Sequence, residues 1–169
     1  MFTSQQKEEF MQAAMAQARL AQTQDEIPIG AVVVDQKGQI IGRGYNRREL
    51  DQDACQHAEL IAIRQACQAL HSWRLIDCSL FVTLEPCAMC AGAIINARLK
   101  SLVFGALDPK AGACGSVVDL LSVSKFNHHP QVIRGFYRAE NSQMLKNFFR
   151  AVRAGRQQKP GQKKKNKLS

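Results

Sequence analysis

Several features that would place this 169-residue chain in a membrane or outside the cell are missing from its sequence. No apolar run approaches the roughly 20 residues that a helix needs to cross a bilayer. The first ten residues, MFTSQQKEEF, have neither the basic nor the apolar stretch of a secretory signal. The six cysteines are spread too thinly for a disulfide scaffold. We therefore expect a cytoplasmic protein without membrane contact, whose thiols stay free for metal binding or catalysis.

Acidic residues are absent from the C-terminal end of the chain. Seven of the 23 lysines and arginines, and none of the 14 acids, lie in 153–169, so residues 1–152 carry only +2 of the net charge of +9. The Gly, Pro, Gln and Lys content of 154–169 predicts a solvated, disordered tail after a single domain over 1–153. Such a tail attracts nucleic-acid phosphates, although on charge alone an anionic membrane surface would attract it too.

Helices and strands are predicted to alternate along the chain, with no internal repeat. Helical periodicity indicates helices over 5–24, 58–70, 87–97 and about 139–153, with Pro28 expected to end the first of them. Runs typical of strands cover 30–35, 39–45, 79–84 and 102–105. Strands interleaved with helices of this length predict an α/β sandwich whose sheet is covered on both faces.

The stretch 83-TLEPCAMC-90 contains a C-x-x-C pair, and the sequence has no second one. This absence helps to decide what kind of site the pair forms. Pro86 favours a helix start, so Cys87 and Cys90 would share one face of a first turn, where the helix dipole favours thiolates. Redox dithiols and metal sites share this spacing. A closed structural zinc site needs four ligands, typically as a second close pair, and Cys55, Cys67, Cys78 and Cys114 do not supply one.

One histidine has a chemical companion, in the stretch 57-HAE-59. His57 with Cys87 and Cys90 gives three ligands and leaves the fourth tetrahedral position to water, as in catalytic zinc sites. Glu59 can share this site only if His57 lies at or just before the first turn of its helix; otherwise Glu59 is an acid favoured there by the dipole. Two thiolates neutralise the zinc ion, which makes it a poorer Lewis acid than an ion held by three neutral imidazoles. A nearby base such as Glu59 would compensate by taking the proton of the water and passing it to a ring nitrogen and a leaving amine. Such a reaction is a hydrolytic deamination.

The combination of His-x-Glu at 57–59 with Pro-Cys-x-x-Cys at 86–90 resembles the signature of the zinc-dependent nucleobase deaminases. Nearly the whole chain is similar to the bacterial tRNA-specific adenosine deaminases, of the cytidine deaminase-like superfamily. The matching segments are 26-EIPIGAVVV-34, Asn46, 57-HAELIAIRQA-66, 74-RLID-77, 79-SLFVTLEPCAMCAGAIINAR-98, 103-VFGALDPKAGACGS-116 and 148-FFRAVR-153.

This resemblance implies a fold, a partner and a reaction. The fold is a three-layer α/β/α sandwich with a five-stranded mixed sheet, in a homodimer that carries one Zn²⁺ per chain. The substrate is the wobble adenosine of a tRNA anticodon stem-loop, which becomes inosine when zinc-bound hydroxide attacks C6. An anticodon-loop base is already unpaired, so extruding it costs only a few kcal/mol of unstacking.

The resemblance also implies roles for individual residues. His57, Cys87 and Cys90 would hold the zinc, and Glu59 would carry the proton to N1. The implied substrate-binding set joins base contacts, pocket-edge residues and RNA contacts: Asn46, Ala58, Glu85, Pro86, Asp108, Lys110 and Phe149.

Without the resemblance, some of this set has a plainer explanation. Asn46 and Asp108 would be turn residues before Arg47 and Pro109. In the implied set, Asn46 hydrogen-bonds the base, and Asp108 touches a sugar of the anticodon loop. Ala58 and Glu85 provide backbone contacts in the same arrangement. Arg150 and Arg153 of the last helix, together with the tail, would contact phosphates.

The chain departs from the family pattern at 53-DACQ-56, where many members have a small residue directly before the histidine. Cys55 and Gln56 there bear on substrate preference, and Cys55 is expected near the metal without binding it. Two other functions stay open. A deaminase of a free base or nucleoside, of cytosine or guanine type, would not need the basic tail or the segment 103–116. A non-catalytic, zinc-stabilised RNA-binding domain would not need an open coordination position beside a glutamate.

Overall fold

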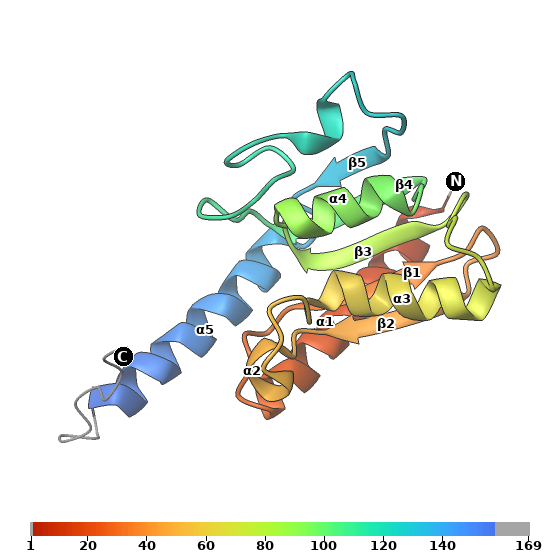
Figure 1. Ribbon diagram of the computed structural model, residues 1–169. Helices are drawn as coiled ribbons and strands as arrows, with labels where there is room; N and C mark the ends of the chain where they lie inside the picture. The colour runs from red at the N-terminus through yellow and green to blue at the C-terminus, as the bar shows by residue number, and fades with distance from the viewer. Residues whose placement is uncertain (1, 158–169) are drawn as a thin grey trace.

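The computed structural model describes residues 2–157, in which helices and strands alternate (Figure 1). In chain order the elements are α1 (Ser4–Thr23), β1 (Gly30–Val34), β2 (Ile40–Tyr45), α2 (Arg48–Asp51), α3 (Ala58–Leu70), β3 (Ser79–Leu84), α4 (Ala88–Asn96), β4 (Ser101–Ala106), the 3-10 turn η1 (Leu120–Ser122), β5 (Gln131–Arg134) and α5 (Arg138–Gln157). A capping box starts α1, with the Thr3 hydroxyl accepting from Gln6 N and the Gln6 side chain accepting from Thr3 N.

The five strands form one mixed sheet in the order β2-β1-β3-β4-β5. β1 pairs antiparallel with β2 and with β3, whereas β3, β4 and β5 run parallel to one another. The central strands β1, β3 and β4 are buried almost throughout and consist mainly of apolar residues, as strands covered on both faces require.

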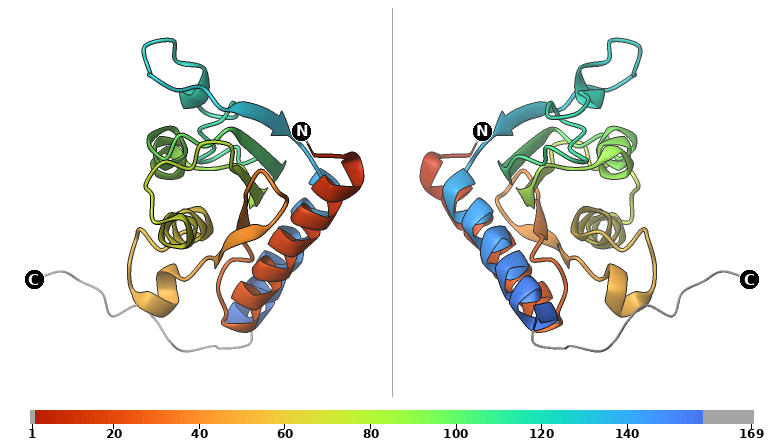
Figure 2. Two further views of the ribbon diagram at one scale, coloured as in Figure 1. Left: turned by 90° about the vertical axis from the view of Figure 1, so that its right-hand side faces the viewer. Right: turned by 90° about the vertical axis from the view of Figure 1, so that its left-hand side faces the viewer.

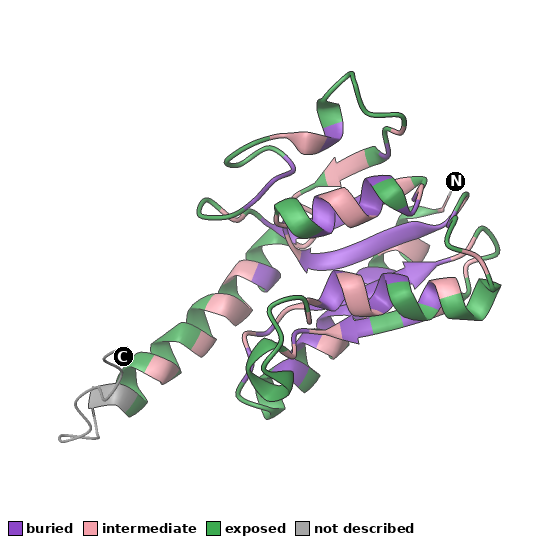
Figure 3. Ribbon diagram, in the orientation of Figure 1, coloured by how far each residue is buried: buried purple, intermediate pink, exposed green. Residues whose placement is uncertain are grey.

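Helices cover both faces of this sheet (Figure 2). On one face α1 packs on β1, β2 and β3, and α5 packs on β4. On the other face α3 packs on β1 and β2, with α4 beside it (Figure 1). Two apolar cores result, one between the sheet and α3 and α4, the other between the sheet and α1 (Figure 3). This arrangement confirms the predicted three-layer α/β/α sandwich with a five-stranded mixed sheet.

Glycines in β2 let α3 approach the sheet closely. A Cβ at Gly44 would overlap the carbonyl oxygen of Ala58, and one at Gly42 would overlap that of Ala62. These two glycines therefore set how far the first turns of α3 lie from the sheet, and His57 and Glu59 belong to the first of those turns.

Strand directions bring five chain segments to one edge of the sheet. The parallel strands β3 and β4 end there, at Leu84 and Ala106. Because β1 is antiparallel to both of its neighbours, it begins at the same edge, and β2 ends there at Tyr45. The segments before β1 and after β2, β3 and β4 therefore meet at this edge, together with the start of α3. This is the position where sheets with parallel strands usually carry their binding sites.

The sequence-based boundaries needed some corrections. The first helix ends at Thr23 with Gln24 as its C-cap, before Asp25 in the left-handed region, so Pro28 does not end it. The periodicity predicted neither the four-residue helix α2 nor the strand β5. The last helix continues to Gln157, so 154–157, assigned to the tail, are helical. The remainder of the predicted tail, 158–169, lies outside the described residues.

None of the helices within 2–157 is long and apolar enough to cross a membrane.

Candidate metal centre and substrate pocket

Three potential metal ligands converge at the sheet edge. His57, Cys87 and Cys90 offer one nitrogen and two sulfur atoms, all within 4.8 Å of one another. His57 Nδ1 lies 3.6 Å from the sulfur of Cys87 and 3.6 Å from that of Cys90. Cys90 is buried, and the other two are partly buried. Cys55, which was expected near the metal without binding it, is exposed and is not part of this cluster.

The backbone explains why these residues meet. His57 is the N-cap of α3 and Cys87 is the N-cap of α4, so two helix N-termini point at the cluster. Their unpaired N–H groups and dipoles favour anionic sulfur. The predicted position of His57 just before its first turn is confirmed, which places Glu59 in that turn on the same side of the molecule.

The spacing of the cluster fits a tetrahedral zinc ion. Zn–S bonds of about 2.3 Å and Zn–N bonds of about 2.05 Å place a sulfur and a nitrogen ligand about 3.6 Å apart in such a site. Both sulfur–nitrogen distances of the cluster have this value. Three ligands of the nitrogen and sulfur type leave one tetrahedral position free of protein, as in catalytic zinc sites.

Without a metal ion, Cys87 and Cys90 lie close enough to change the pKa of each other. A shared hydrogen bond lowers the pKa of Cys87 and raises that of Cys90. The hydrogen bond with Cys87 also raises the pKa of His57. Glu59 is 4% exposed, and this burial raises its pKa to about 7. A carboxyl group beside a metal cluster with a pKa near neutrality is suited to proton transfer.

A pocket of about 370 Å³ opens above Glu59 and the ligands. This volume lies in the usual range for small-molecule sites, roughly 300–1,000 Å³. Nine of the predicted site residues line it: Asn46, His57, Ala58, Glu59, Glu85, Cys87, Asp108, Lys110 and Phe149. Cys90 lies in the ligand cluster, and Pro86 sits beside the pocket with its carbonyl accepting from Ala113 N. Arg150 and Arg153 are exposed on α5 and do not line the pocket.

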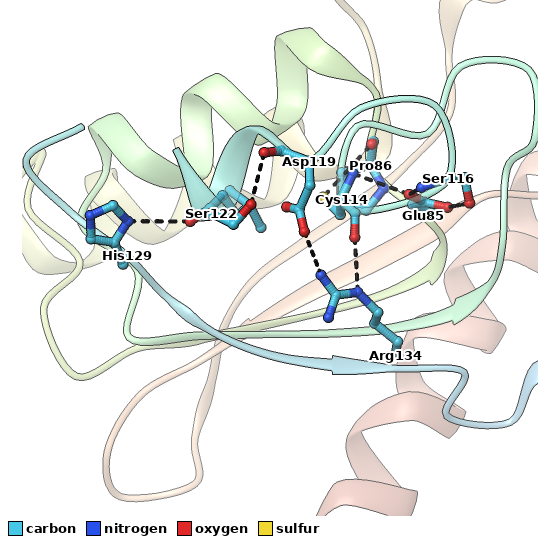
Figure 4. Close-up of polar contacts among 9 residues, drawn as sticks. Glu85, Pro86, Cys114, Ser116, Asp119, Ser122, His129 and Arg134 are labelled. Atoms are coloured by element: carbon cyan, nitrogen blue, oxygen red, sulfur yellow. Dashed lines mark hydrogen bonds and ion pairs between the residues drawn. The ribbon is translucent and has the colours of Figure 1, made fainter. Parts of the chain in front are cut away.

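Glu85 organises the loop that forms one wall of the pocket (Figure 4). Its carboxylate is 2% exposed and accepts from the backbone N of Asp108 at 3.0 Å, Cys114 at 3.1 Å and Ser116 at 2.9 Å, and from the Ser116 hydroxyl. Burial opposes the charged form of Glu85, but these hydrogen bonds outweigh it and lower its pKa. A Cβ at Gly112 would overlap the same carboxylate. The structure therefore gives the side chain of Glu85 a role that the sequence did not indicate.

A second anchor holds this loop from β5. Arg134 donates from Nε to the carbonyl of Cys114 and from Nη2 to Asp119, both at 2.9 Å (Figure 4). With Glu85 at the end of β3, the loop after β4 is fixed from both sides. Asp108 in turn accepts from Lys110 N at 3.0 Å, which shapes the turn that carries these two of the predicted RNA contacts.

Several pocket residues were not predicted from the sequence. Most are apolar and come from the segments that meet at this edge: Ile27, Ile29, Leu84, Leu107, Pro109, Ala111 and Leu145. The unpredicted cation among the lining residues is Arg48, whereas its neighbour Arg47 pairs with Asp51 at 2.8 Å. Ile27 and Ile29 belong to the stretch 26–34 that matches the family, and this match was the available signal that the segment lies at the site.

Comparison with known proteins agrees with this site. Residues 5–153 match the family described as MafB19-like deaminase. The chain is 46% identical over 148 residues to a tRNA-specific adenosine deaminase of Bacillus subtilis, a match that covers 88% of this chain and 91% of that protein. A solved structure of a tRNA:A34 deaminase, studied for A-to-I editing at the wobble position, has a TM-score of 0.78 at 45% identity and covers 81% and 99% of the two chains.

A guanine deaminase of Bacillus subtilis is a more distant structural relative, with a TM-score of 0.58 at 31% identity and coverage of 87% and 93% of the two chains. Fold, ligand cluster and family match together define the class of this protein, which is a deaminase with the cytidine deaminase-like fold. Within this class, the chain belongs to the family of tRNA-specific adenosine deaminases. The chain is therefore an enzyme.

Proposed function

We propose that the enzyme converts the wobble adenosine of a tRNA anticodon loop to inosine, consuming water and releasing ammonia. The observation that carries this proposal is the open His57–Cys87–Cys90 cluster with the buried carboxyl group of Glu59 at the floor of one pocket. A binding domain would have no use for a buried acid beside an incomplete ligand set. The similarity to tRNA-specific adenosine deaminases supports adenosine in tRNA as the substrate.

The ligand set supports one zinc ion per chain, held by His57 Nδ1 and the two sulfur atoms. When bound, zinc would supply Lewis-acid activation of a water molecule. Two thiolate ligands leave the ion with little residual charge, so the protein must contribute a base. Glu59 is the titratable side chain that lies beside the cluster and lines the pocket.

Glu59 would move two protons during the reaction. Its carboxylate takes a proton from the attacking water and gives it to N1 of adenine as C6 becomes tetrahedral. A second proton passes from the added hydroxyl group through Glu59 to the amine, which leaves C6 as ammonia while the C6 carbonyl of inosine forms. Atoms and protons balance, because adenosine and water become inosine and ammonia.

The pocket walls would hold the base and its ribose. Asn46 would bind the base through its side-chain amide, and Ala58 would contribute a backbone contact at the start of α3. Asp108 and Lys110 lie on the wall that Glu85 organises, where we propose they contact the sugar and backbone of the RNA. Phe149 of α5, with 41% of its surface exposed, would contact the RNA at the pocket mouth.

The test is a direct comparison of substrates with the purified zinc-loaded enzyme. Anticodon stem-loops with A or with C at the wobble position are incubated beside free adenosine, cytidine and guanine, and inosine and ammonia are measured. We expect inosine from the wobble-A stem-loop at a kcat/KM well above that of every free compound. Guanine is included because of the structural likeness to a guanine deaminase. Faster turnover of a free base or nucleoside than of the stem-loop would contradict the proposal.

A further inference from the structure

One buried carboxylate lies directly behind the pocket without lining it. Glu26 follows Asp25, whose left-handed backbone turns the chain after α1, and its N–H donates to the carbonyl of Ala21 at 3.0 Å. Its side chain is 1% exposed. No lysine, arginine or histidine within residues 2–157 lies at ion-pair distance from it. Burying a carboxylate without a cation is unfavourable unless hydrogen bonds satisfy its oxygens.

Two hydrogen bonds satisfy the carboxylate, and both lead to the pocket. Oε2 of Glu26 accepts from the amide Nδ2 of Asn46 at 3.0 Å, and Oε1 accepts from the backbone N of Leu50 at 2.7 Å. Asn46 is 3% exposed and lines the pocket. Leu50 lies in the short helix α2, whose first residue, Arg48, also lines the pocket.

Both side-chain oxygens of Glu26 accept hydrogen bonds, Oε2 from Asn46 Nδ2 and Oε1 from Leu50 N, and this orients the amide of Asn46. An asparagine amide has two orientations of almost the same shape, which exchange a donor for an acceptor. With Glu26 behind it, the Nδ2 end must face the carboxylate, and the Oδ1 end must lie on the other side. The backbone of Asn46 is held separately, because its N–H donates to the carbonyl of Ile29 at 3.0 Å. Nδ2 also donates to the carbonyl of Ile27, at a longer distance of 3.5 Å. Glu26 therefore accepts the shorter of the two hydrogen bonds that orient the amide, and the backbone N–H holds the position of the residue.

The same carboxylate joins three segments of the pocket wall. It belongs to the segment that continues into Ile27 and Ile29, it holds Asn46 after β2, and it receives the N–H of Leu50 from α2. Each of the three segments contributes residues that line the pocket: Ile27 and Ile29, then Asn46, then Arg48.

We propose that Glu26 is a positioning residue for base recognition: it sets the hydrogen-bonding pattern that Asn46 presents to the substrate and does not itself touch the substrate. This inference rests on the proposed function, in which Asn46 binds the extruded base. It assigns Glu26 a role in substrate selection that is independent of metal binding, since Glu26 is not part of the His57–Cys87–Cys90 cluster.

The test starts from Glu26→Gln in the zinc-loaded enzyme. Glutamine has one acceptor oxygen, so its NH₂ group must face either the Leu50 N–H, donor against donor, or the Asn46 amide. In the second case the Asn46 amide must turn its Oδ1 toward the glutamine and present Nδ2 on the other side. We expect kcat/KM for the wobble-A stem-loop to fall at least ~10-fold with unchanged zinc content. Glu49→Gln is the matched control: Glu49 is exposed on α2, its loss changes the charge equally, and kcat/KM should stay within about 2-fold of wild type.

A double-mutant cycle with Asn46→Ala separates positioning from general destabilisation. If Glu26 acts through the Asn46 amide, Glu26→Gln should cost less than about 2-fold in kcat/KM once that amide is gone. A merely structural role would give the same loss in both backgrounds, and that additive result would overturn the proposal. Thermal denaturation of all four proteins shows whether each variant is folded at the assay temperature.

A readout independent of turnover comes from NMR of the Asn46 side-chain amide. In wild type its two protons should be well separated and slow to exchange, and Glu26→Gln should shift them while Glu49→Gln leaves them in place. Unshifted Asn46 amide signals in Glu26→Gln would overturn the proposal. Turnover of the wild-type enzyme is measured first in the same assay, so that a failure of the proposed function is detected separately. The double-mutant cycle is then measured with the substrate that the wild-type enzyme deaminates.

Discussion

At the scale of single residues, the proposed reaction assigns metal binding and proton transfer to different side chains. The ligand atoms of His57, Cys87 and Cys90 lie within 4.8 Å of one another, and Glu59 lies beside them in the first turn of α3. Burial raises the pKa of the Glu59 carboxyl group to about 7, which suits the proton transfer that we propose for this residue. Loss of the acid should therefore remove chemistry and leave the metal in place.

Replacement of Glu59 by alanine or glutamine tests this separation. We expect either variant to retain about one zinc per chain and to lose at least ~10²-fold in rate, since general acid–base catalysis typically contributes ~10²–10⁴-fold. Zinc is measured by elemental analysis and rate by inosine formation under single-turnover conditions. His57→Ala is the contrasting variant, which should lose zinc as well as activity. Full activity of Glu59→Gln would show that another group carries the proton.

The thiols should differ in reactivity in a way that reports metal occupancy. Cys55 is exposed and should react first with a thiol reagent at pH 8. Burial raises the pKa of Cys78 to about 11 and that of Cys114 to about 12, so these two remain protonated and unreactive below those values. Chelation of zinc should add Cys87 to the reactive set. Mass spectrometry of labelled peptides, with and without chelator, measures this; equal labelling of Cys87 in both would contradict metal binding there.

At the scale of elements, the distance between α3 and β2 determines where His57, the proposed metal ligand, and Glu59, the proposed proton carrier, lie. Gly44 faces the carbonyl of Ala58 in the first turn of α3, directly after His57. Any side chain at Gly44 must push that turn away from the sheet. Because His57 and Glu59 move with the turn, packing in β2 is coupled to the geometry of the metal site.

Gly44→Ala should therefore reduce both stability and zinc affinity. Overpacking of this kind typically costs about 1–3 kcal/mol, which in a chain of this size lowers Tm by about 2–4 °C per kcal/mol. Gly92→Ala on α4 is the control, because a Cβ there meets no atom within 4 Å and an added alanine favours the helix by about 0.5–1 kcal/mol. Calorimetry measures Tm and so checks the stability, and competition with a chelating dye measures the zinc affinity. Unchanged zinc affinity in Gly44→Ala would show that the first turn does not depend on this contact.

Much of the layered fold could be predicted because the long elements carry strong patterns. The predictions for α3 and β3 match the observed bounds, 58–70 and 79–84, since each is a continuous apolar or periodic run. β5 was missed because four residues, 131-QVIR-134, are only partly buried or exposed and give no alternation long enough to detect. α2 was missed because it is a single turn, held from outside by the Glu26 carboxylate at Leu50 N.

The clustering of His57, Cys87 and Cys90 could be predicted from spacing and chemistry, but the pocket wall could not. Cys87 and Cys90 are neighbours on one helix, and His57 stood out through Glu59. The roles of Glu26 and of the Glu85 carboxylate depend on partners 20 to 31 residues away, which no local pattern encodes. Long-range hydrogen bonds of this kind become visible only once strand order is known.

At the scale of the whole molecule, positive charge is concentrated in the C-terminal part of the sequence, which begins in α5. Phe149 of α5 lines the pocket, and Arg150 and Arg153 follow it as exposed residues of the same helix. The basic residues of 158–169 continue from this helix in sequence. The homodimer implied by the resemblance stays a prediction, which a mass measurement in solution can check.

Binding of RNA should accordingly depend on salt through this end of the chain. Replacing Arg150 and Arg153 by alanine should flatten the slope of log K against log salt by about 1 per lost phosphate contact, with zinc content unchanged. Deleting 158–169 should flatten it further. Arg64→Ala, at an exposed position of α3, is the control. Stem-loop affinity is measured between low and physiological salt; an unchanged slope in both variants would show that this end of the chain does not contact phosphates.

The position of Phe149 and Leu145 on α5 has a consequence for how the enzyme matures during translation. The metal ligands lie between residues 57 and 90, whereas these pocket-lining residues come from positions 145 to 149, near the end of the described chain. Domains generally fold as units. During synthesis the residues of the ligand cluster therefore leave the ribosome before the segment that completes the pocket, and we expect the full substrate pocket to form only after α5 has been synthesised.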